Sequence, residues 1–346
     1  MTQTDKAPRS TIVDVARAAG VSRQTVSNAV NNPERVRPET LERVLQEIAR
    51  LNYRASSAAQ TLRHQRAGAV GTELDGVTGS PSDVAYPFLV ALTIAAPAHS
   101  AHLVPFASRE SFPLLAGYQD MVRRRLVDAF VLTDTHHGDP RPQWLASEGI
   151  PYAAFGRIHD DPSLTSWGDV DGAAGIKMAV AHLADSGYGR IAYLGWPLAS
   201  SEVGDDRHRG WLVGTDQHGL RRGPSAFALQ DLPGAAAAAD LLLSKLEPGD
   251  AVICASDVLA LGVLHALGRR GWLPGRDIGI TGFDASTTAR RHGITSLAQP
   301  LQDIAHHLLG LVHDQLAGAP APDMGTLFLP TLTVGQSTDT TMKGTL

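Results

Sequence analysis

Cysteine is nearly absent from this chain of 346 residues, since Cys254 is the only one. A single cysteine excludes an intramolecular disulfide and any zinc site built from cysteines. The first ten residues, MTQTDKAPRS, contain no apolar run, so we expect no signal peptide and a cytoplasmic protein. Segment 84–108 lacks charged side chains over the length of a membrane span, but its prolines predict a helix followed by a strand.

The sequence also lacks the common motifs of enzymes. There is no Gly-x-Ser-x-Gly nucleophile elbow and no phosphate loop ending in Gly-Lys-Ser/Thr. Gly187 and Gly189 precede an expected strand, whereas a dinucleotide fingerprint follows one. The histidine pairs 136–137 and 306–307 lack metal-ligand spacing, because adjacent side chains on a helix point about 100° apart. We therefore expect no catalysis, no cofactor and no metal.

Composition and charge are those of a globular protein with an uneven distribution of basic residues. Hydrophobic residues make up 43% of the chain and charged residues 19%. The first 66 residues contain eleven basic and six acidic side chains, a net charge of +5, whereas the whole chain carries −5. Basic charge is thus concentrated where a small N-terminal domain would meet phosphates.

Residues 11–31 have the pattern of two short helices joined by a tight turn at Gly20. Ser22 can cap the second helix by accepting from its free backbone N–H groups. An apolar stripe at steps of three and four residues predicts the buried face of the first helix, and valines predict that of the second: Ile12, Val15, Ala16 and Ala19, then Val21, Val26 and Val30.

The outward face of the second helix is polar. Arg23, Gln24 and Asn28 would meet base edges in the major groove, where Arg suits guanine and Gln suits adenine. Short polar groups suited to phosphates flank them: Ser22, Thr25, Ser27 and Asn31. The two helices alone would also fit any small helical hairpin. A third amphipathic helix starts near Pro38, and its expected buried stripe is Leu41, Val44, Leu45, Ile48 and Leu51.

The run from Thr11 to Leu62, which continues into SSAAQTLRHQR, resembles the headpiece and hinge of the lactose-repressor (LacI/GalR) family. The resemblance implies a helix-turn-helix DNA-binding headpiece over 1–54 and a hinge helix over 55–66. It implies a homodimer on a pseudo-palindromic operator, with Ala59 and Leu62 of paired hinges in the minor groove. An apolar wedge there would unstack a base step and bend the DNA.

After the hinge, apolar strands alternate with helices, which is typical of an α/β fold with parallel sheets. Expected strands are 69–74, 102–107, 128–134, 151–156, 190–196, 226–230, 251–256, 278–283 and 326–330. Expected helices are 87–98, 117–125, 171–186, 207–219, 235–246, 257–270 and 301–317.

The family resemblance continues to about residue 335 and implies a two-lobed, periplasmic-binding-protein-like core over 67–340. We place lobe 1 at about 67–160 plus 298–320 and lobe 2 at about 163–295 plus 330–340. The expected chain crossings lie near 157–165, 294–298 and 317–331. Lobe 1 helices 87–98 and 117–125 would form the dimer interface, and the lack of a leucine heptad after 335 favours a dimer.

An effector cleft is expected where strands end, because open parallel sheets bind ligands beyond their carboxyl ends. The resemblance implies that Arg207, Asp284 and Gln299 hydrogen-bond a small polar effector there. Further candidates are Arg157 and Ser256 at strand ends and the aromatic covers Tyr86, Phe88, Trp167 and Trp196. We interpret Asp257 as the cap of the helix that follows it.

The sequence therefore predicts a DNA-binding transcription repressor that a sugar or glycoside releases from its operator. In the alternative of a regulator with a nucleobase co-repressor, the small molecule would strengthen operator binding instead of weakening it. A small-molecule-binding protein with a non-functional headpiece would show no sequence-specific DNA binding.

Overall fold

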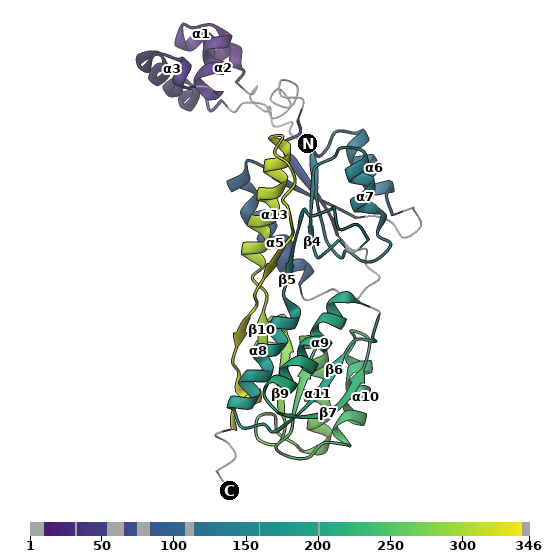
Figure 1. The fold of residues 1–346 in the computed structure, drawn as a ribbon. Coiled ribbons are helices and arrows are strands. Elements are labelled where there is room, and N and C mark those ends of the chain that lie inside the picture. Colours follow the sequence, from purple (N-terminus) through teal and green to yellow (C-terminus); the bar gives the residue numbers. More distant parts are fainter. Residues whose placement is uncertain are drawn as a thin grey trace, which may run out of the picture. The chain divides into compact units, whose positions relative to one another are not determined.

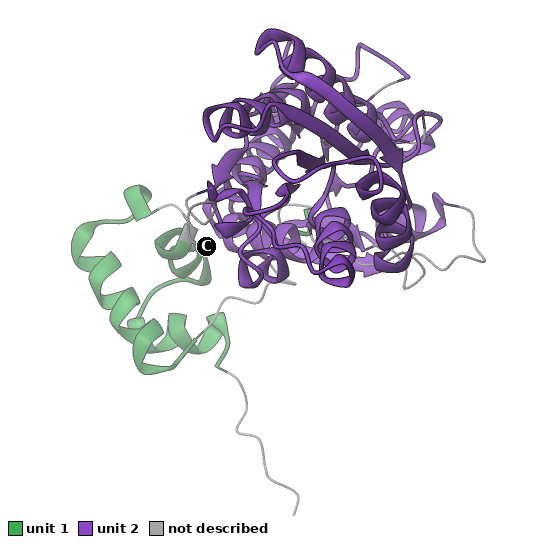
Figure 2. Cartoon of the chain, turned by 90° about the horizontal axis from the view of Figure 1, so that it is seen from below, with its two compact units in different colours: residues 1–67 green, residues 68–346 purple. Residues whose placement is uncertain are grey.

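The computed structural model describes residues 10–31, 33–53, 66–74, 84–107, 114–158, 160–199 and 201–340. The chain divides into two compact units, Met1–Ala67 and Gly68–Leu346, which we call the headpiece and the core (Figure 2). Each unit is described by itself.

The headpiece is a bundle of short helices with defined ends: α1 (Ile12–Ala19), α2 (Arg23–Asn31), η1 (Pro33–Arg35) and α3 (Pro38–Arg50). Thr11 and Asp14 form a reciprocal capping box at the start of α1. Gly20 ends α1 with φ +66°, a left-handed conformation that favours glycine. Ser22 caps α2 as predicted, because its Oγ accepts from the Thr25 backbone N–H at 3.1 Å.

Val15, Val26 and Val44 are fully buried and form the centre of the headpiece core. Two predicted core residues are instead exposed: Val30 by 40% and Leu45 by 48%. Val44 lies at the centre of the buried stripe of α3, so Leu45, the next residue, is turned about 100° away from it. On α2, Val26 and Ala29 already fill the inner face, which leaves Val30 at its edge.

The core contains two lobes, and each is built on a six-stranded sheet of described residues. The first sheet has the order β11-β5-β4-β3-β1-β2 and is parallel throughout. Its strands are β1 (Ala69–Leu74), β2 (His102–Ala107), β3 (Ala129–Leu132), β4 (Tyr152–Phe155), β5 (Trp167–Val170) and β11 (Thr326–Phe328). Its helices are α5 (Ala85–Ala95), η2 (Ala96–His99), α6 (Ala116–Arg123), α7 (Pro140–Ser147) and α13 (Leu301–Leu316). Figure 1 shows α5 and α13 on one face of this sheet and α6 and α7 on the other.

The second sheet has the order β12-β10-β9-β8-β6-β7, with β12 antiparallel to β10 and the other pairs parallel. Its strands are β6 (Arg190–Gly195), β7 (Arg221–Phe227), β8 (Ala251–Cys254), β9 (Gly279–Phe283), β10 (Thr295–Ala298) and β12 (Thr331–Thr333). Its helices are α8 (Gly172–Asp185), α9 (Glu202–Gln217), α10 (Leu232–Leu243), α11 (Asp257–Arg270), α12 (Thr287–Arg291) and η3 (Gln336–Thr338). Helix α8 packs on α9, and α10 packs on α11.

The predicted α/β class with parallel sheets is confirmed, and the differences concern short or atypical elements. Strand β7 covers 221–227 instead of 226–230, because this edge strand starts with two exposed arginines and has no apolar run there. The expectation missed β5, β10, β12, α7 and α12, which are short and contain Gly, Ser, Thr, Pro or Arg residues.

The chain crosses between the lobes after β5, after β10 and after β11, at residues 171, 299–300 and 329–330. The first crossing was expected at 157–165, but the chain returns from that loop to lobe 1 as β5. The second was expected at 294–298, where the chain still forms β10 of lobe 2. The third lies within the expected 317–331. Lobe 1 thus extends to residue 170, because residues 167–170 (WGDV) form strand β5. This segment was not expected to be a strand, since it contains no apolar run.

No helix in these described ranges is both long enough and apolar enough to cross a membrane. The charge-free segment after residue 84 consists of α5, η2 and β2.

Candidate DNA-binding and effector sites

Helix α2 presents the predicted base-reading residues at the surface. Arg23 and Gln24 are exposed in its first turn, and Asn28 is half-buried one turn later. The Gln24 Nε2 donates to the Asn28 Oδ1 at 3.1 Å, so these two side chains share one face. The Ser22 and Thr25 hydroxyls are 2.9 Å apart at the start of the helix. The face is therefore polar and lies at a helix N-terminus, which suits contact with DNA phosphates.

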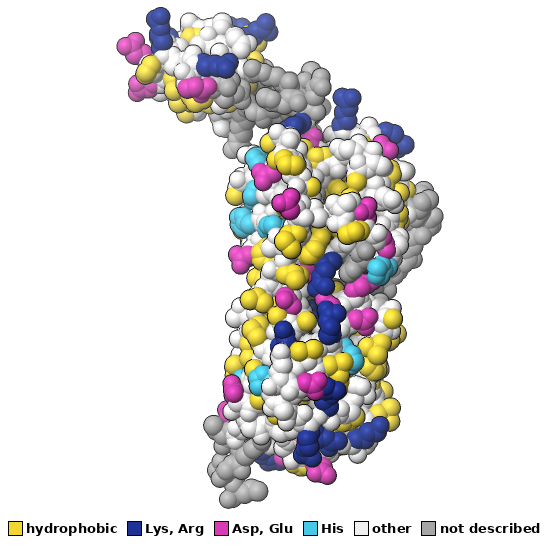
Figure 3. Space-filling view, in the orientation of Figure 1, with side chains coloured by type: hydrophobic (Ala, Val, Ile, Leu, Met, Phe, Trp, Pro, Cys, Tyr) yellow, Lys and Arg dark blue, Asp and Glu magenta, His cyan; other side chains and the backbone are white. Residues whose placement is uncertain are grey.

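Three predicted DNA contacts lie outside the described residues. They are the hinge residues Ala59 and Leu62 and the side chain of Asn31. On the headpiece face drawn in Figure 3, arginine side chains lie among Asp and Glu side chains, so the surface is mixed in charge.

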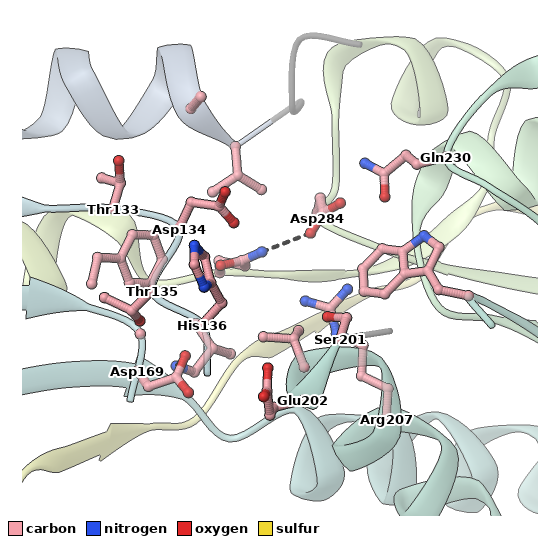
Figure 4. A pocket seen from close by; sticks show the side chains of 18 of the residues that line it. Thr133, Asp134, Thr135, His136, Asp169, Ser201, Glu202, Arg207, Gln230 and Asp284 are labelled. Carbon is pink, nitrogen blue, oxygen red and sulfur yellow. Dashed lines mark hydrogen bonds between the residues drawn. The ribbon is translucent and has the colours of Figure 1, made fainter. Parts of the chain in front are cut away.

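The core contains a cleft of about 640 Å³ between the carboxyl ends of the two sheets. This volume is within the usual range for small-molecule sites. Lobe 1 contributes α5, the loops after β3 and β4 and the end of β5, and lobe 2 contributes α9 and the loops after β6, β7 and β9. Figure 4 shows Thr133, Asp134, Thr135, His136 and Asp169 on one side of this cavity and Ser201, Glu202, Arg207, Gln230 and Asp284 on the other.

Arg207 of α9 is the buried cation of the cleft, with 4% of its surface exposed. Its Nη1 donates to the Ala255 carbonyl at 2.5 Å, and its guanidinium lies 3.6 Å from the Phe283 ring centroid. Burial lowers the pKa of Arg207, and the Asp284 carboxylate opposes this shift. Its Nε has no hydrogen-bond partner among the described residues. The same holds for the indole Nε1 of Trp196, whose ring is 5.3 Å from the guanidinium carbon.

Asp284 follows β9 in a rare backbone conformation, with φ +108° for a non-glycine residue. Its backbone N–H donates to the Leu297 carbonyl at 2.7 Å, and its Oδ1 accepts from the Gln299 Nε2 at 2.6 Å. Strained conformations of this kind concentrate at functional sites, where the surrounding structure holds them. The turn after β9 and the second lobe crossing are thereby joined at the cleft.

The interpretation of Asp257 as a helix cap is wrong. Ser256 is the N-cap of α11 and accepts from the Leu259 backbone N–H. Asp257 is fully buried and accepts from the Ser296 hydroxyl and the Ser286 backbone N–H, both at 2.6 Å. It therefore ties α11 to β10 and to the start of α12.

Arg157 lies beside the cleft and joins the lobes. Its Nε is 3.1 Å from an Asp169 oxygen of lobe 1, and its Nη2 forms an ion pair with Asp206 of lobe 2. Burial raises the pKa of Asp169, and the charge of Arg157 opposes that shift. His137 of lobe 1 forms a second contact between the lobes, 3.3 Å from a Glu202 oxygen of α9.

The structure brings only part of the predicted effector set together. Phe88, Arg207, Asp284, Gln299 and the cover Trp196 line the cleft, and the Phe88 ring is 4.4 Å from that of Phe155. Four predicted members do not line it: Arg157 lies beside it, Tyr86 is 73% exposed, Trp167 packs over Gly325, and Ser256 is fully buried as a cap.

Sequence reasoning missed several lining residues: Thr133, Asp134, Thr135, His136, Asp169, Ser201, Glu202, Leu229 and Gln230. The loop after the predicted strand 128–134 could have been included by the strand-end rule that found Asp284. Asp169 could not be found in that way, because its strand was not recognised.

A helix-turn-helix headpiece joined in one chain to a two-lobed core with a buried polar cleft defines a DNA-binding regulator that responds to a small molecule. Residues 11–56 match the family described as bacterial regulatory proteins, lacI family, and residues 180–338 match the periplasmic binding protein-like domain. The chain therefore combines a lacI-family DNA-binding domain with a periplasmic-binding-protein-like domain, and its relatives are HTH-type transcriptional regulators.

Relatives match along nearly the whole chain. The HTH-type transcriptional regulator CelR of Thermobifida fusca is 29% identical over 324 residues, which cover 90% of this chain and 93% of CelR. GalS of Salmonella typhimurium is 29% identical over 334 residues, which cover 93% of this chain and 94% of GalS. A solved complex of CelR with cellobiose is 26% identical, covers 95% of this chain and 100% of that one, and has a TM-score of 0.69. The lac repressor dimer bound to operator and ONPF shares the fold, with 22% identity over 96% of this chain and 100% of that one and a TM-score of 0.74.

Proposed function

We propose that this regulator is a homodimeric repressor that binds a pseudo-palindromic operator and is released by a small neutral sugar. Two copies of α2 would enter successive major-groove half-sites, with Arg23, Gln24 and Asn28 toward the bases. Ser22, Thr25, Ser27 and Asn31 would contact phosphates. Helices α5 and α6 are the expected dimer interface. The proposed place of action is the cytoplasm, where such a regulator would meet its operator DNA.

The hinge would act between the two headpieces of the dimer. Ala59 would allow two hinge helices to approach, and Leu62 would be wedged between base pairs in the minor groove. A Leu62→Ala protein that bound its operator as tightly as the native chain would contradict this role.

The main observation in favour of a sugar effector is a pair of buried hydrogen-bond donors on the cleft wall. Arg207 Nε and Trp196 Nε1 lack acceptors, so a ligand that supplies oxygen atoms would satisfy both. Four carboxylates also line the cleft, those of Asp134, Asp169, Glu202 and Asp284, and they outnumber Arg207 in the lining together with Arg157 beside it. Negative potential disfavours anionic ligands, whereas hydroxyl groups both donate and accept. A neutral sugar fits both conditions, and the aromatic rings Trp196, Phe88 and Phe155 can cover its apolar face.

Effector binding would act by changing how the lobes close. The lobes are joined by three crossings and by the contacts of Arg157 with Asp206 and of His137 with Glu202. A ligand that binds one arrangement better shifts the population toward it, and a coupling of about 1 to 3 kcal/mol would lower operator affinity roughly 5- to 150-fold.

The test is fluorescence anisotropy of the full protein on DNA from its own upstream region, at fixed salt because phosphate contacts are salt-dependent. Cellobiose, maltose, galactose, glucose 6-phosphate and guanine are added separately. We expect release by a neutral sugar and none by glucose 6-phosphate. Tighter binding with guanine would establish a co-repressor system, and the absence of specific DNA binding would contradict the proposal.

A further inference from the structure

Lobe 1 contains a buried charged cluster that the cleft itself does not include. Arg141, in the first turn of α7, is 4% exposed, and Glu73, Asp139 and Tyr118 around it are 8%, 9% and 0% exposed. Such groups are costly to bury unless each is paired and hydrogen-bonded. The cluster brings together the end of β1, helix α6, helix α7 and the loop after β3.

Every nitrogen of the Arg141 guanidinium is used. The Nε donates to Asp139 Oδ1 at 2.9 Å, and the Nη1 donates to Glu73 and to the Tyr118 hydroxyl oxygen, both at 3.3 Å. The Tyr118 hydroxyl in turn donates to Glu73 at 2.9 Å, which fixes the direction of that hydrogen bond. Three acceptors therefore hold the guanidinium plane in one orientation.

The Nη2 of Arg141 points toward loop 133–136, which follows β3 and lines the cleft. It donates to the backbone carbonyls of Thr133 at 2.9 Å and Asp134 at 3.1 Å. Asp134 has φ +54°, a left-handed conformation that is uncommon for non-glycine residues, although aspartate adopts it more readily than most. Thr133, Asp134, Thr135 and His136 all line the cleft.

We propose that Arg141 is a positioning residue of the effector site, which holds the loop 133–136 in the shape that presents its side chains to the ligand. The inference rests on the proposed effector function of the cleft. A planar fork is required, because Nη2 must reach two adjacent carbonyls and an Asp139 oxygen while Nε holds Asp139 and Nη1 holds Glu73 and Tyr118. For stability alone, a buried ion pair can often be replaced by apolar side chains without loss.

The main test is Arg141→Lys, which keeps the positive charge beside Glu73 and Asp139 but loses the fork. Tyr118→Phe, which removes only a hydroxyl group, is the second variant in case the first does not fold. Arg190→Lys is the matched control, because Arg190 pairs with Asp250 in lobe 2 and does not line the cleft. Backbone hydrogen exchange followed by mass spectrometry needs no ligand and is measured first.

We expect amides of residues 133–138 to exchange about fivefold to tenfold faster in Arg141→Lys, with a smaller change in Tyr118→Phe and none in Arg190→Lys. Acceleration confined to this loop supports positioning. Unchanged exchange in the loop, or equal acceleration in all strands of lobe 1, overturns it, because a purely structural role would affect the whole lobe.

Affinity is then measured by calorimetry with cellobiose, maltose and galactose. Any of these sugars that binds the native chain should bind Arg141→Lys about tenfold more weakly and bind Arg190→Lys equally well. Equal affinity in Arg141→Lys overturns the inference. If no sugar binds the native chain, the proposed sugar effector fails, whereas the exchange result still decides whether Arg141 positions the loop.

Discussion

The Gln299 amide donates to the Asp284 carboxylate at 2.6 Å, and this hydrogen bond joins the second lobe crossing to the turn after β9. Asp284 is thereby held in its rare conformation at the cleft wall. Gln299 lies in the second crossing between the lobes. The side chain that orients a cleft carboxylate therefore belongs to a segment that connects the two lobes.

Replacing Gln299 should weaken effector binding and leave the headpiece unaffected. Gln299→Leu removes a hydrogen bond to a charged group, which costs about 1.5 to 3 kcal/mol, or roughly 10- to 150-fold in affinity. Calorimetry with the releasing sugar measures this, and anisotropy without sugar should show native operator binding. Gln302→Leu, at an exposed position of α13, is the control. Native sugar affinity in Gln299→Leu would rule out this role.

Arg207→Lys should weaken the response to sugar and spare operator binding. An ammonium group cannot stack on the Phe283 ring as a guanidinium does, and it cannot present two donors in one plane. We expect at least about a tenfold loss in sugar affinity, the effect of about 1.4 kcal/mol. Operator anisotropy with increasing sugar measures it. Loss of operator binding by the folded variant would mean that the two sites are not separate.

The packing of α9 on α8 depends on Gly210. A Cβ at this position would lie 2.6 Å from the Ala173 carbonyl oxygen, and backbone cannot move aside cheaply. Gly210→Ala should therefore lower the free energy of unfolding of the core by about 1 to 3 kcal/mol, the usual cost of overpacking. Gly268→Ala is the matched control, because nothing lies within 4 Å of a Cβ there and alanine favours the helix by about 0.5 to 1 kcal/mol. Urea unfolding of both variants compares them.

The contact of His137 with Glu202 should make lobe closure weakly pH-dependent. A hydrogen bond to Asp160 raises the pKa of His137 above its ordinary value of 6.5, with Glu202 adding to the shift. A raised pKa in the folded state means that the stabilisation is fully present below pH 6.5 and is lost as pH rises through the folded-state pKa. Histidine NMR titration of the native chain and of Glu202→Gln measures this. A His137 pKa at or below 6.5 in the native chain would contradict it.

Gln24 should determine part of the half-site sequence. Gln24→Ala removes a side chain suited to adenine, so discrimination at one base pair should fall by about 1 to 3 kcal/mol while phosphate contacts persist. Selection of binding sites from random DNA, compared between the native chain and the variant, identifies the position. Gln46→Ala, exposed on α3, is the control and should select the native sequence. An unchanged preference in Gln24→Ala would exclude Gln24 from base reading.

The sequence by itself determined the local structure and the chemistry of the DNA-binding helix. The cap at Ser22, the turn at Gly20 and the buried stripe through Val15 and Val26 depend on neighbours within a few residues, so the pattern predicted them. Arg207 and Asp284 were found because strand ends and helix starts can be recognised along the chain.

Only the tertiary structure decided which residues meet across the lobes. Strand β5 is too short and polar to be recognised, and without it neither Asp169 nor the first crossing could be placed. The Arg141 cluster joins residues 68 positions apart, Glu73 and Arg141, and no local pattern relates them. Similarly, Trp167 and Tyr86 are aromatic residues of the kind that cover a ligand, but Trp167 packs against Gly325 and Tyr86 is exposed outside the cleft lining. Long-range contacts depend on how the sheets are ordered, and this order is a property of the folded chain.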